Sequence, residues 1–196
     1  MRRDGDKATA RAMIALLVVT MAGCGELTPE EKAERRARGA IATLRMRLGQ
    51  RLQAALVEGG EAAVEVCANE AASLRDGVEQ ETGVRLGRAS LRRRNPEPPA
   101  PAWVTGWLEA QGERPVEGVA GVAEASGGVA RVLEPIGVAP LCLTCHGGRP
   151  GDAPRAGVAA MDMGVSGALA RRYPADVATG YAVGDLRGAF WAEADY

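Results

Sequence analysis

The spacing of apolar residues predicts that the amino-terminal half of the chain is helical. Over residues 41–56, apolar positions recur every three or four residues, which is the period of an α-helix. The Thr-Pro pair at 28–29 is typical of a helix start, and the glycine pair at 59–60 of a helix end. A second helical pattern covers residues 61–75. Its apolar stripe contains Cys67, which we therefore expect to point inward.

Beyond residue 80 the pattern changes to short strands with one more helix. Residues 83–91 alternate loosely and predict a strand, and residues 102–111, with two tryptophans, predict a short helix. Two valine-rich runs within residues 116–138 flank a Ser-Gly-Gly turn and predict a β-hairpin. After a helical turn at 169–173, the glycine-punctuated end of the chain predicts an irregular tail.

The first residues have the layout of a bacterial export signal. Basic residues precede an apolar run at 12–22, which leads directly to Cys24. The run is about half of the ~20 residues that a permanent membrane-spanning helix needs. We expect residues 1–23 to be a cleaved signal peptide. Cys24 is then expected to carry a lipid anchor on the periplasmic side of a bacterial membrane. The alternative is a soluble periplasmic protein with an incidental Cys24.

The rest of the chain is long enough for one domain with its own core. We expect residues 24–39 to be a tether and residues 40–196 to be the domain. The formal net charge is -1, with 24 basic and 25 acidic residues. Because a nucleic-acid binder needs a basic excess, we do not expect nucleic acid as a partner.

Four cysteines and a single histidine are the main candidate ligands of the chain. Residues 142–146 read Cys-Leu-Thr-Cys-His, the C-x-x-C-H pattern of c-type haem attachment. Two thiols at this spacing can add across the two vinyl groups of the porphyrin, and the adjacent imidazole can bind the iron. Cys142 and Cys145 are thus the predicted thioether positions of one haem c, and His146 is a predicted iron ligand.

Two other interpretations of this motif are weaker. Cys67, Cys142, Cys145 and His146 could formally supply four ligands to zinc, but adjacent Cys145 and His146 are poor tetrahedral partners. A dithiol redox pair should follow a strand and open a helix, whereas here Gly-Gly-Arg-Pro follows the motif.

The second iron ligand cannot be a histidine, because His146 is the only one in the sequence. The candidates are Cys67, Met46, Met161, Met163 and the lysines. Methionine would raise the reduction potential, whereas a thiolate stabilises ferric iron and lowers it. We favour Cys67, since an unpaired thiol in an oxidising compartment is a liability without a use. A buried, inert thiol is the alternative.

Five segments of the chain match the motifs of a known family in the family's order. They lie at residues 64–67, 87–96, 133–136, 142–147 and 173–190. Together they resemble the periplasmic haem-c domains with a PAS-like fold, which occur as single-haem cytochromes and as input domains of sensor kinases and chemoreceptors. The resemblance extends over most of residues 40–190.

This resemblance implies an α+β domain in which helices, including a long amino-terminal one, flank a PAS-like antiparallel sheet with the haem against it. It also implies that Cys67, in the Glu-Val-Cys segment, is the second axial ligand opposite His146. Haem propionates need cationic or amide partners, for which the family signature suggests Arg94, Asn95 and Arg187. A simple turn at Asn95 and a surface cation at Arg187 are the alternatives.

An iron with imidazole and thiolate ligands has no open position for a substrate, which disfavours an enzyme. We expect a low-potential, lipid-anchored electron carrier that serves an unidentified redox partner. The alternative is a redox or gas (NO or CO) sensor that acts through a separate signalling protein, because reduction weakens the iron–thiolate bond. Peroxide turnover at a five-coordinate haem is viable only if Cys67 is not a ligand.

Overall fold

A computed structural model describes residues 26–95 and 99–196, which form helices around one antiparallel sheet. The helices are α1 (Pro29–Glu58), α2 (Gly60–Asn69), α3 (Ala71–Thr82), α4 (Ala102–Gln111), α5 (Leu143–His146) and α6 (Met163–Arg172), with a 3₁₀ turn, η1, at Pro140–Cys142. The strands are β1 (Arg85–Ala89), β2 (Val122–Ser126), β3 (Val129–Gly137) and β4 (Leu186–Asp195). The expected α+β class is confirmed. The predicted signal peptide and Cys24 lie outside the described residues.

Helix α1 begins and ends where the sequence predicts. Thr28 and Glu31 form a capping box: the Thr28 amide donates to Glu31 Oε2 at 2.8 Å, and the Glu31 amide donates to Thr28 Oγ1 at 3.2 Å. Near this start, Ala33 and Ala37 are buried in the main core. Residues 29–39, which we expected to be a tether, are therefore part of the domain, because their alanines let the helix pack closely against the sheet.

The sheet has the strand order β1-β4-β3-β2, and every neighbouring pair is antiparallel. The predicted strand at β1 and the predicted hairpin of β2 and β3 are confirmed. The prediction of an irregular tail at the end of the chain is wrong, because β4 is a ten-residue strand in the interior of the sheet. A strand buried on both faces loses the alternation that identifies a strand. Gly188 suggested a turn, but a Cβ there would lie 2.1 Å from the Ala89 carbonyl oxygen, so the close neighbouring strand requires glycine.

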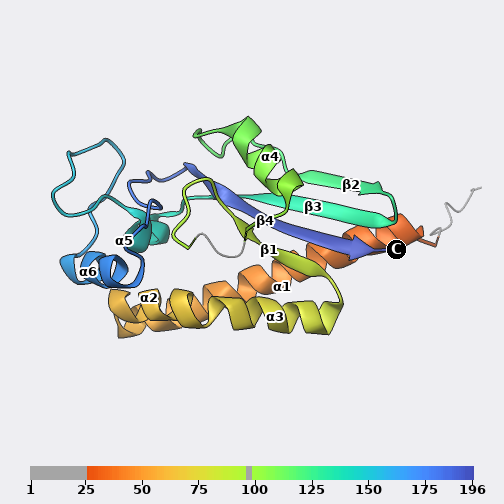
Figure 1. The fold of residues 1–196 in the computed structure, drawn as a ribbon, viewed down its shortest axis with the longest axis horizontal. Coiled ribbons are helices and arrows are strands. Elements are labelled where there is room, and N and C mark those ends of the chain that lie inside the picture. Colours follow the sequence, from red (N-terminus) through yellow and green to blue (C-terminus); the bar gives the residue numbers. More distant parts are fainter. Residues whose placement is uncertain (1–25, 96–98) are drawn as a thin grey trace, which may run out of the picture.

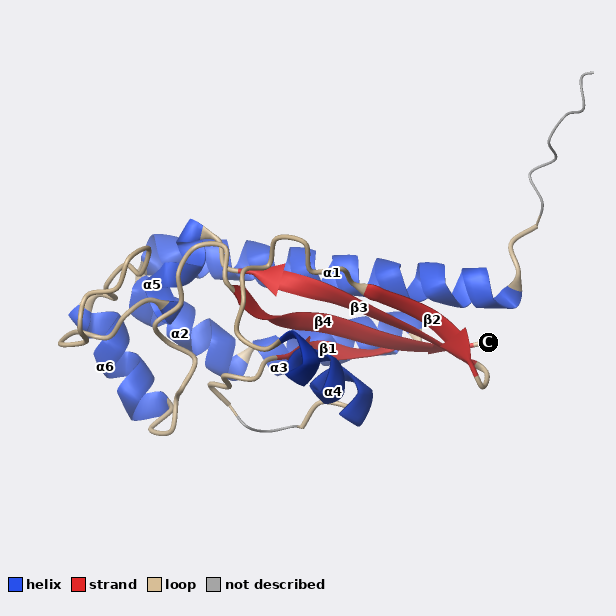
Figure 2. Cartoon of the chain, turned by 90° about the horizontal axis from the view of Figure 1, so that it is seen from above, coloured by secondary structure: helices blue, strands red, loops and turns tan. Residues whose placement is uncertain are grey.

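Helices cover both faces of the sheet. Figures 1 and 2 show α1 running lengthwise along one face and α4 lying on the opposite side. The core under α1 and α3 includes Ile41, Leu44, Val78, Leu86 and Phe190, and the core under α4 includes Val104, Leu108, Leu133 and Ala189. This arrangement leaves one end of the sheet to the remaining helices.

At that end, α2 packs against α6, and α5 lies beside them (Figure 1). Gly60 permits the close approach of α2, since a Cβ at this position would lie 2.3 Å from Val165 Cγ2. The C-x-x-C-H motif is located at this end of the molecule. Among the helices of the described residues, none combines the length and apolar character needed to cross a bilayer.

Candidate functional site

The C-x-x-C-H motif forms a compact helical turn rather than an open loop. Cys142 ends η1, and Cys145 and His146 lie in the short helix α5. Leu143 anchors the turn, because it is buried and packs in the same cluster as the buried ring of Tyr181. The two thiols and the imidazole are therefore held on one short, fixed segment, as the predicted haem attachment would require.

Gly147 lets the chain cross the end of the motif at close range. A Cβ at Gly147 would lie 2.1 Å from the carbonyl oxygen of Ala159 and 2.8 Å from that of Leu143. Beside it, the Gly148 amide donates to the Ala159 carbonyl at 2.9 Å, and the Met161 amide donates to the Gly148 carbonyl at 2.8 Å. These bonds tie the motif to the segment that leads into α6.

The segment before β4 clamps the motif from another side. The Gly180 amide donates to the Gly147 carbonyl at 2.7 Å, and the Tyr181 amide donates to the His146 carbonyl at 3.0 Å. The Nδ1 atom of His146 lies 2.7 Å from the Ala178 carbonyl oxygen. Because a carbonyl only accepts, we assign the proton to Nδ1, which donates to Ala178. The lone pair of Nε2 is then available to a metal.

His146 is held in its neutral form. Burial is the largest cause, and the guanidinium groups of Arg187 and Arg94 add to it, holding the pKa of His146 well below its usual range. The hydrogen bond to Ala178 acts in the opposite direction, with a smaller effect. The neutral imidazole is the protonation state that binds a metal.

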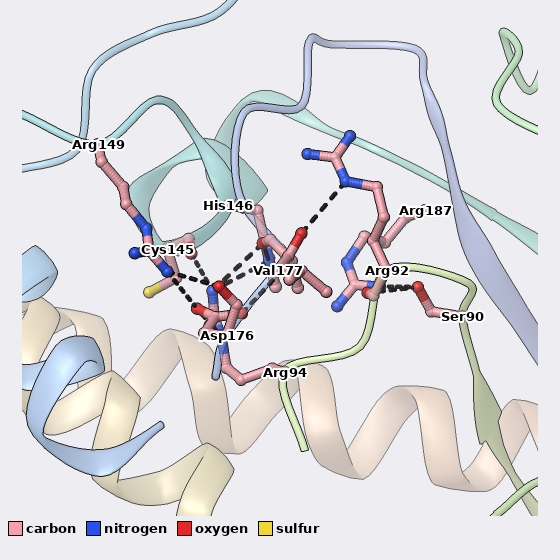
Figure 3. A network of polar contacts seen from close by, with 10 residues as sticks. Ser90, Arg92, Arg94, Cys145, His146, Arg149, Asp176, Val177 and Arg187 are labelled. Atoms are coloured by element: carbon pink, nitrogen blue, oxygen red, sulfur yellow. Dashed lines mark hydrogen bonds and ion pairs between the residues drawn. The ribbon is translucent and has the colours of Figure 1, made fainter. Parts of the chain in front are cut away.

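Arg94 and Asp176 form a buried ion pair beside His146 (Figure 3). Arg94 Nε donates to Asp176 Oδ2 at 3.0 Å, and the Asp176 side chain is fully buried. Arg94 Nη2 donates to the Cys145 carbonyl and, at 3.4 Å, to the Ala178 carbonyl, and it lies 3.3 Å from His146 Nδ1. Asp176 Oδ1 accepts from the Ala178 amide at 2.8 Å. The pair thus joins the motif to the segment that orients the imidazole.

Cys67 is exposed, so the predicted inward orientation is wrong. It lies near the end of α2, one turn beyond Val64, which is buried against α6. Within α2, Ala63, Val64 and Val66 are buried by neighbouring elements, whereas no part of the described chain covers Cys67.

Cys67 nevertheless lies within electrostatic range of the motif. Burial raises the pKa of Cys145 to about 11, and negative charge on Cys67 contributes to this rise, against the opposing charge of Arg94. Burial also raises the pKa of Tyr173, and Cys67 is the next largest cause. The thiol of Cys67 is therefore exposed on the side of the molecule that carries Cys145.

The other candidates for the second ligand differ in their positions. Met161 is buried in the cluster that also contacts Cys145, as expected for a residue that fills the core. Met46 and Met163 are 53% and 79% exposed. Lys32 pairs with Glu26 at 2.8 Å, near the start of α1. Among these methionines and Lys32, Met161 alone packs against the motif.

One side-chain donor of Arg187 is unsatisfied among the described residues. Its Nε atom is buried and has no hydrogen-bond partner within the described part of the chain. Its Nη1 donates to Ser90 Oγ at 2.5 Å and to the Arg92 carbonyl at 3.4 Å. The guanidinium carbon lies 5.2 Å from the ring centroid of Tyr181, and burial lowers the pKa of Arg187. An anionic group beside Arg187 would compensate this buried charge.

The three predicted propionate contacts occupy different surroundings. Arg94 is held by Asp176 and by backbone carbonyls, whereas Nε of Arg187 has no partner in the stretches 26–95 and 99–196. Asn95 is exposed at the end of the described stretch 26–95. For the zinc alternative, no group of three or more His, Cys, Asp or Glu side chains is placed to hold a metal ion in residues 26–95 and 99–196.

Sequence reasoning missed Asp176, Arg149 and the backbone of Ala178. Arg149 Nη2 donates to the Asp176 carbonyl at 2.6 Å and lies 4.0 Å from Oδ2 of the same residue. One sequence signal could have identified Asp176, because it lies two residues before a small residue in a segment that contains several glycines. This is the pattern of an Asx turn, in which the carboxylate accepts from the backbone two residues on.

Comparisons with known proteins identify a family and a similar fold. No curated protein sequence matches the chain. A solved structure described as the cyanobacterial heme-protein Tll0287 matches the fold with a TM-score of 0.53 at 19% sequence identity. The match covers 86% of this chain and 97% of that one. The family model described as Tll0287-like matches residues 9–193. The chain therefore belongs to the Tll0287-like family.

Proposed function

We propose that this chain is an exported, lipid-anchored, mono-haem c-type cytochrome-like protein that transfers electrons. Thioether bonds to Cys142 and Cys145 hold one haem c, His146 and Cys67 bind its iron, and Cys24 carries the lipid anchor. When bound, haem supplies a one-electron Fe(III)/Fe(II) couple. The relation to a solved haem protein supports the choice of cofactor.

The state of His146 is the observation that carries this proposal. The imidazole directly follows the second cysteine, is kept neutral by burial, and is oriented by its Nδ1 contact of 2.7 Å with the Ala178 carbonyl. A hydrogen bond from Nδ1 to a backbone carbonyl is a typical way to fix a histidine that binds a metal through Nε2.

The surrounding polar atoms also fit a haem. The buried Nε of Arg187 lacks a partner within the described residues, and a propionate carboxylate would satisfy both its hydrogen bond and its charge. The donors of Arg94 are hydrogen-bonded to Asp176 and to backbone carbonyls, so we assign Arg94 the role of supporting the motif. Asn95 remains a predicted propionate contact.

Cys67 supports a low-potential electron carrier. Its thiol is exposed and lies within electrostatic range of Cys145. A thiolate ligand favours ferric iron and so lowers the reduction potential. If His146 and Cys67 both bound the iron, no position would be left for a substrate, so the haem would supply electron transfer rather than substrate chemistry.

The exposure of Cys67 also favours a second candidate, a redox or gas sensor. Solvent protons can reach this thiol, so its release from ferrous iron would open a position for CO or NO. The predicted PAS-like character, known from sensor input domains, suits this role. The signal would then pass to a separate protein.

Optical and EPR spectra of the mature protein test the ligand assignment. We expect Cys67→Ser to abolish the thiolate-type ferric spectrum, with Met161→Leu as a control that leaves it unchanged. A Cys67→Ser spectrum identical to the wild type would overturn thiolate ligation. CO binding to the reduced wild type would favour the sensor, and inertness to CO would favour the electron carrier.

A further inference from the structure

The surroundings of His146 contain a charge pair whose two members lie at different distances from the imidazole. Arg94 Nη2 is 3.3 Å from His146 Nδ1, whereas the contacts of the Asp176 carboxylate are to Arg94 Nε and the Ala178 amide. The cation is therefore the member of the pair that contacts the ring.

Arg94 also shares the acceptor that orients the ring. Its Nη2 donates to the Ala178 carbonyl at 3.4 Å, and the same carbonyl accepts from His146 at 2.7 Å. An acceptor shared with a cation withdraws less proton density from the imidazole, so the ring remains a weaker electron donor. Nearby positive charge also disfavours the more oxidised, more positively charged iron. Both effects raise the reduction potential.

Asp176 is placed to hold Arg94 and to moderate its charge. Its side chain is fully buried, and Arg149 lies 4.0 Å from the same carboxylate oxygen that accepts from Arg94. Figure 3 shows the two arginines converging on Asp176 next to the motif. The remaining charged groups that affect His146 are Arg187 and Arg88.

We infer that Arg94 and Asp176 are positioning residues that set the reduction potential of the iron through His146, with opposite signs. Arg94 raises the potential, and Asp176 lowers it by compensating Arg94. This inference rests on the proposed function, in which His146 binds the haem iron.

Potentiometric titration of the mature holoprotein tests the inference. Arg94→Gln removes the cation but keeps an amide donor, so we expect the ferric-to-ferrous ratio at a fixed potential to rise about tenfold. For a one-electron couple this is a fall of about 59 mV. Asp176→Asn leaves Arg94 uncompensated and shifts the potential in the opposite direction. Arg94→Lys, which keeps the charge, should restore most of the wild-type value.

Arg171→Gln is the matched control, because Arg171 is an exposed arginine whose partner is Glu61 at 3.6 Å. Circular dichroism verifies the fold of each variant, and the optical spectrum verifies its ligation. Shifts of the same sign for Arg94→Gln and Asp176→Asn, or no shift with the spectrum intact, overturn the inference. If His146→Gln keeps the wild-type spectrum, the proposed ligation itself fails, which separates the two outcomes.

Discussion

At the scale of single residues, backbone groups orient the chain's one histidine. His146 contacts the Ala178 carbonyl at 2.7 Å, and its own carbonyl accepts from the Tyr181 amide. The C-x-x-C-H spacing identifies His146 in the sequence because the thiols and imidazole have a residue-type signature. Backbone carbonyls have no such signature, so the sequence could identify His146 as a candidate ligand but not the groups that fix its tautomer.

The lowered pKa of His146 predicts a specific pH dependence of stability. As pH falls below about 6.5, the unfolded chain gains a proton on this residue that the native state excludes, so stability is lost. Below about pH 6.5, the contribution of His146 to the free energy of unfolding falls by about 1.4 kcal/mol per pH unit. We expect the difference in unfolding free energy between wild type and His146→Gln to narrow from pH 7 to pH 5 in urea titrations of the haem-free protein, in which the imidazole is not bound to iron. A difference that stays constant would contradict burial of the neutral ring.

Gly147 and Gly148 provide a test of the close crossing over the motif. Gly147→Ala places a methyl group 2.1 Å from the Ala159 carbonyl oxygen, so we expect a loss of about 1–3 kcal/mol in unfolding free energy and reduced haem incorporation. Gly148→Ala is the matched control, since a Cβ at this position would have Val158 Cγ1, at 3.4 Å, as its nearest neighbour. Equal stability of the two variants would show that the motif does not pass so close to residue 159.

At the scale of elements, the helices and strands that the sequence predicts are those whose ends are set by residues close in the chain. The capped helix α1 and the hairpin of β2 and β3 follow from a Thr-Pro start, a glycine pair and a Ser-Gly-Gly turn. The sequence did not predict β4, because a strand in the interior of the sheet lacks the alternation of apolar and polar residues. Its contacts also come from residues distant in sequence. The exposure of Cys67 depends on which elements pack over the end of α2, and helical periodicity does not reveal this.

The packing of α2 against α6 can be tested at Gly60. A methyl group at this position would lie 2.3 Å from Val165 Cγ2, so Gly60→Ala should lower the melting temperature and disturb the position of Cys67. Adding Val165→Ala to this variant removes the clashing atom and should recover part of the lost melting temperature. Gly49→Ala, within α1 and without a neighbour inside 4 Å, serves as a control and should be neutral or stabilising. If the double variant is no more stable than Gly60→Ala, the two helices do not meet as described.

At the scale of the whole molecule, the helices on both faces of the sheet leave the motif at one end. α1 and α3 cover one face and α4 the other, whereas α2, α5 and α6 gather around the C-x-x-C-H turn (Figure 1). The fold class could be predicted from the mixture of helical and strand patterns and from the family resemblance. The grouping of residues 94, 146 and 176 could not, because it requires the tertiary fold.

Attachment to a membrane is a prediction about the whole protein. In bacterial cells, we expect the wild-type chain to incorporate labelled fatty acid, to be processed in a globomycin-sensitive manner, and to fractionate with membranes. Cys24→Ala should lose the label while the export signal is retained. A Cys24→Ala variant that stays as membrane-bound and lipid-labelled as the wild type would contradict the anchor.

Covalent attachment of haem is the central claim, and denaturing mass spectrometry of protein matured outside the cytoplasm tests it most directly. We expect the wild-type chain to be heavier by the mass of one haem after acid-acetone extraction, and a Cys142→Ala, Cys145→Ala double variant to lack this increment. A wild-type chain that releases all of its haem on extraction and has its unmodified mass would contradict the account.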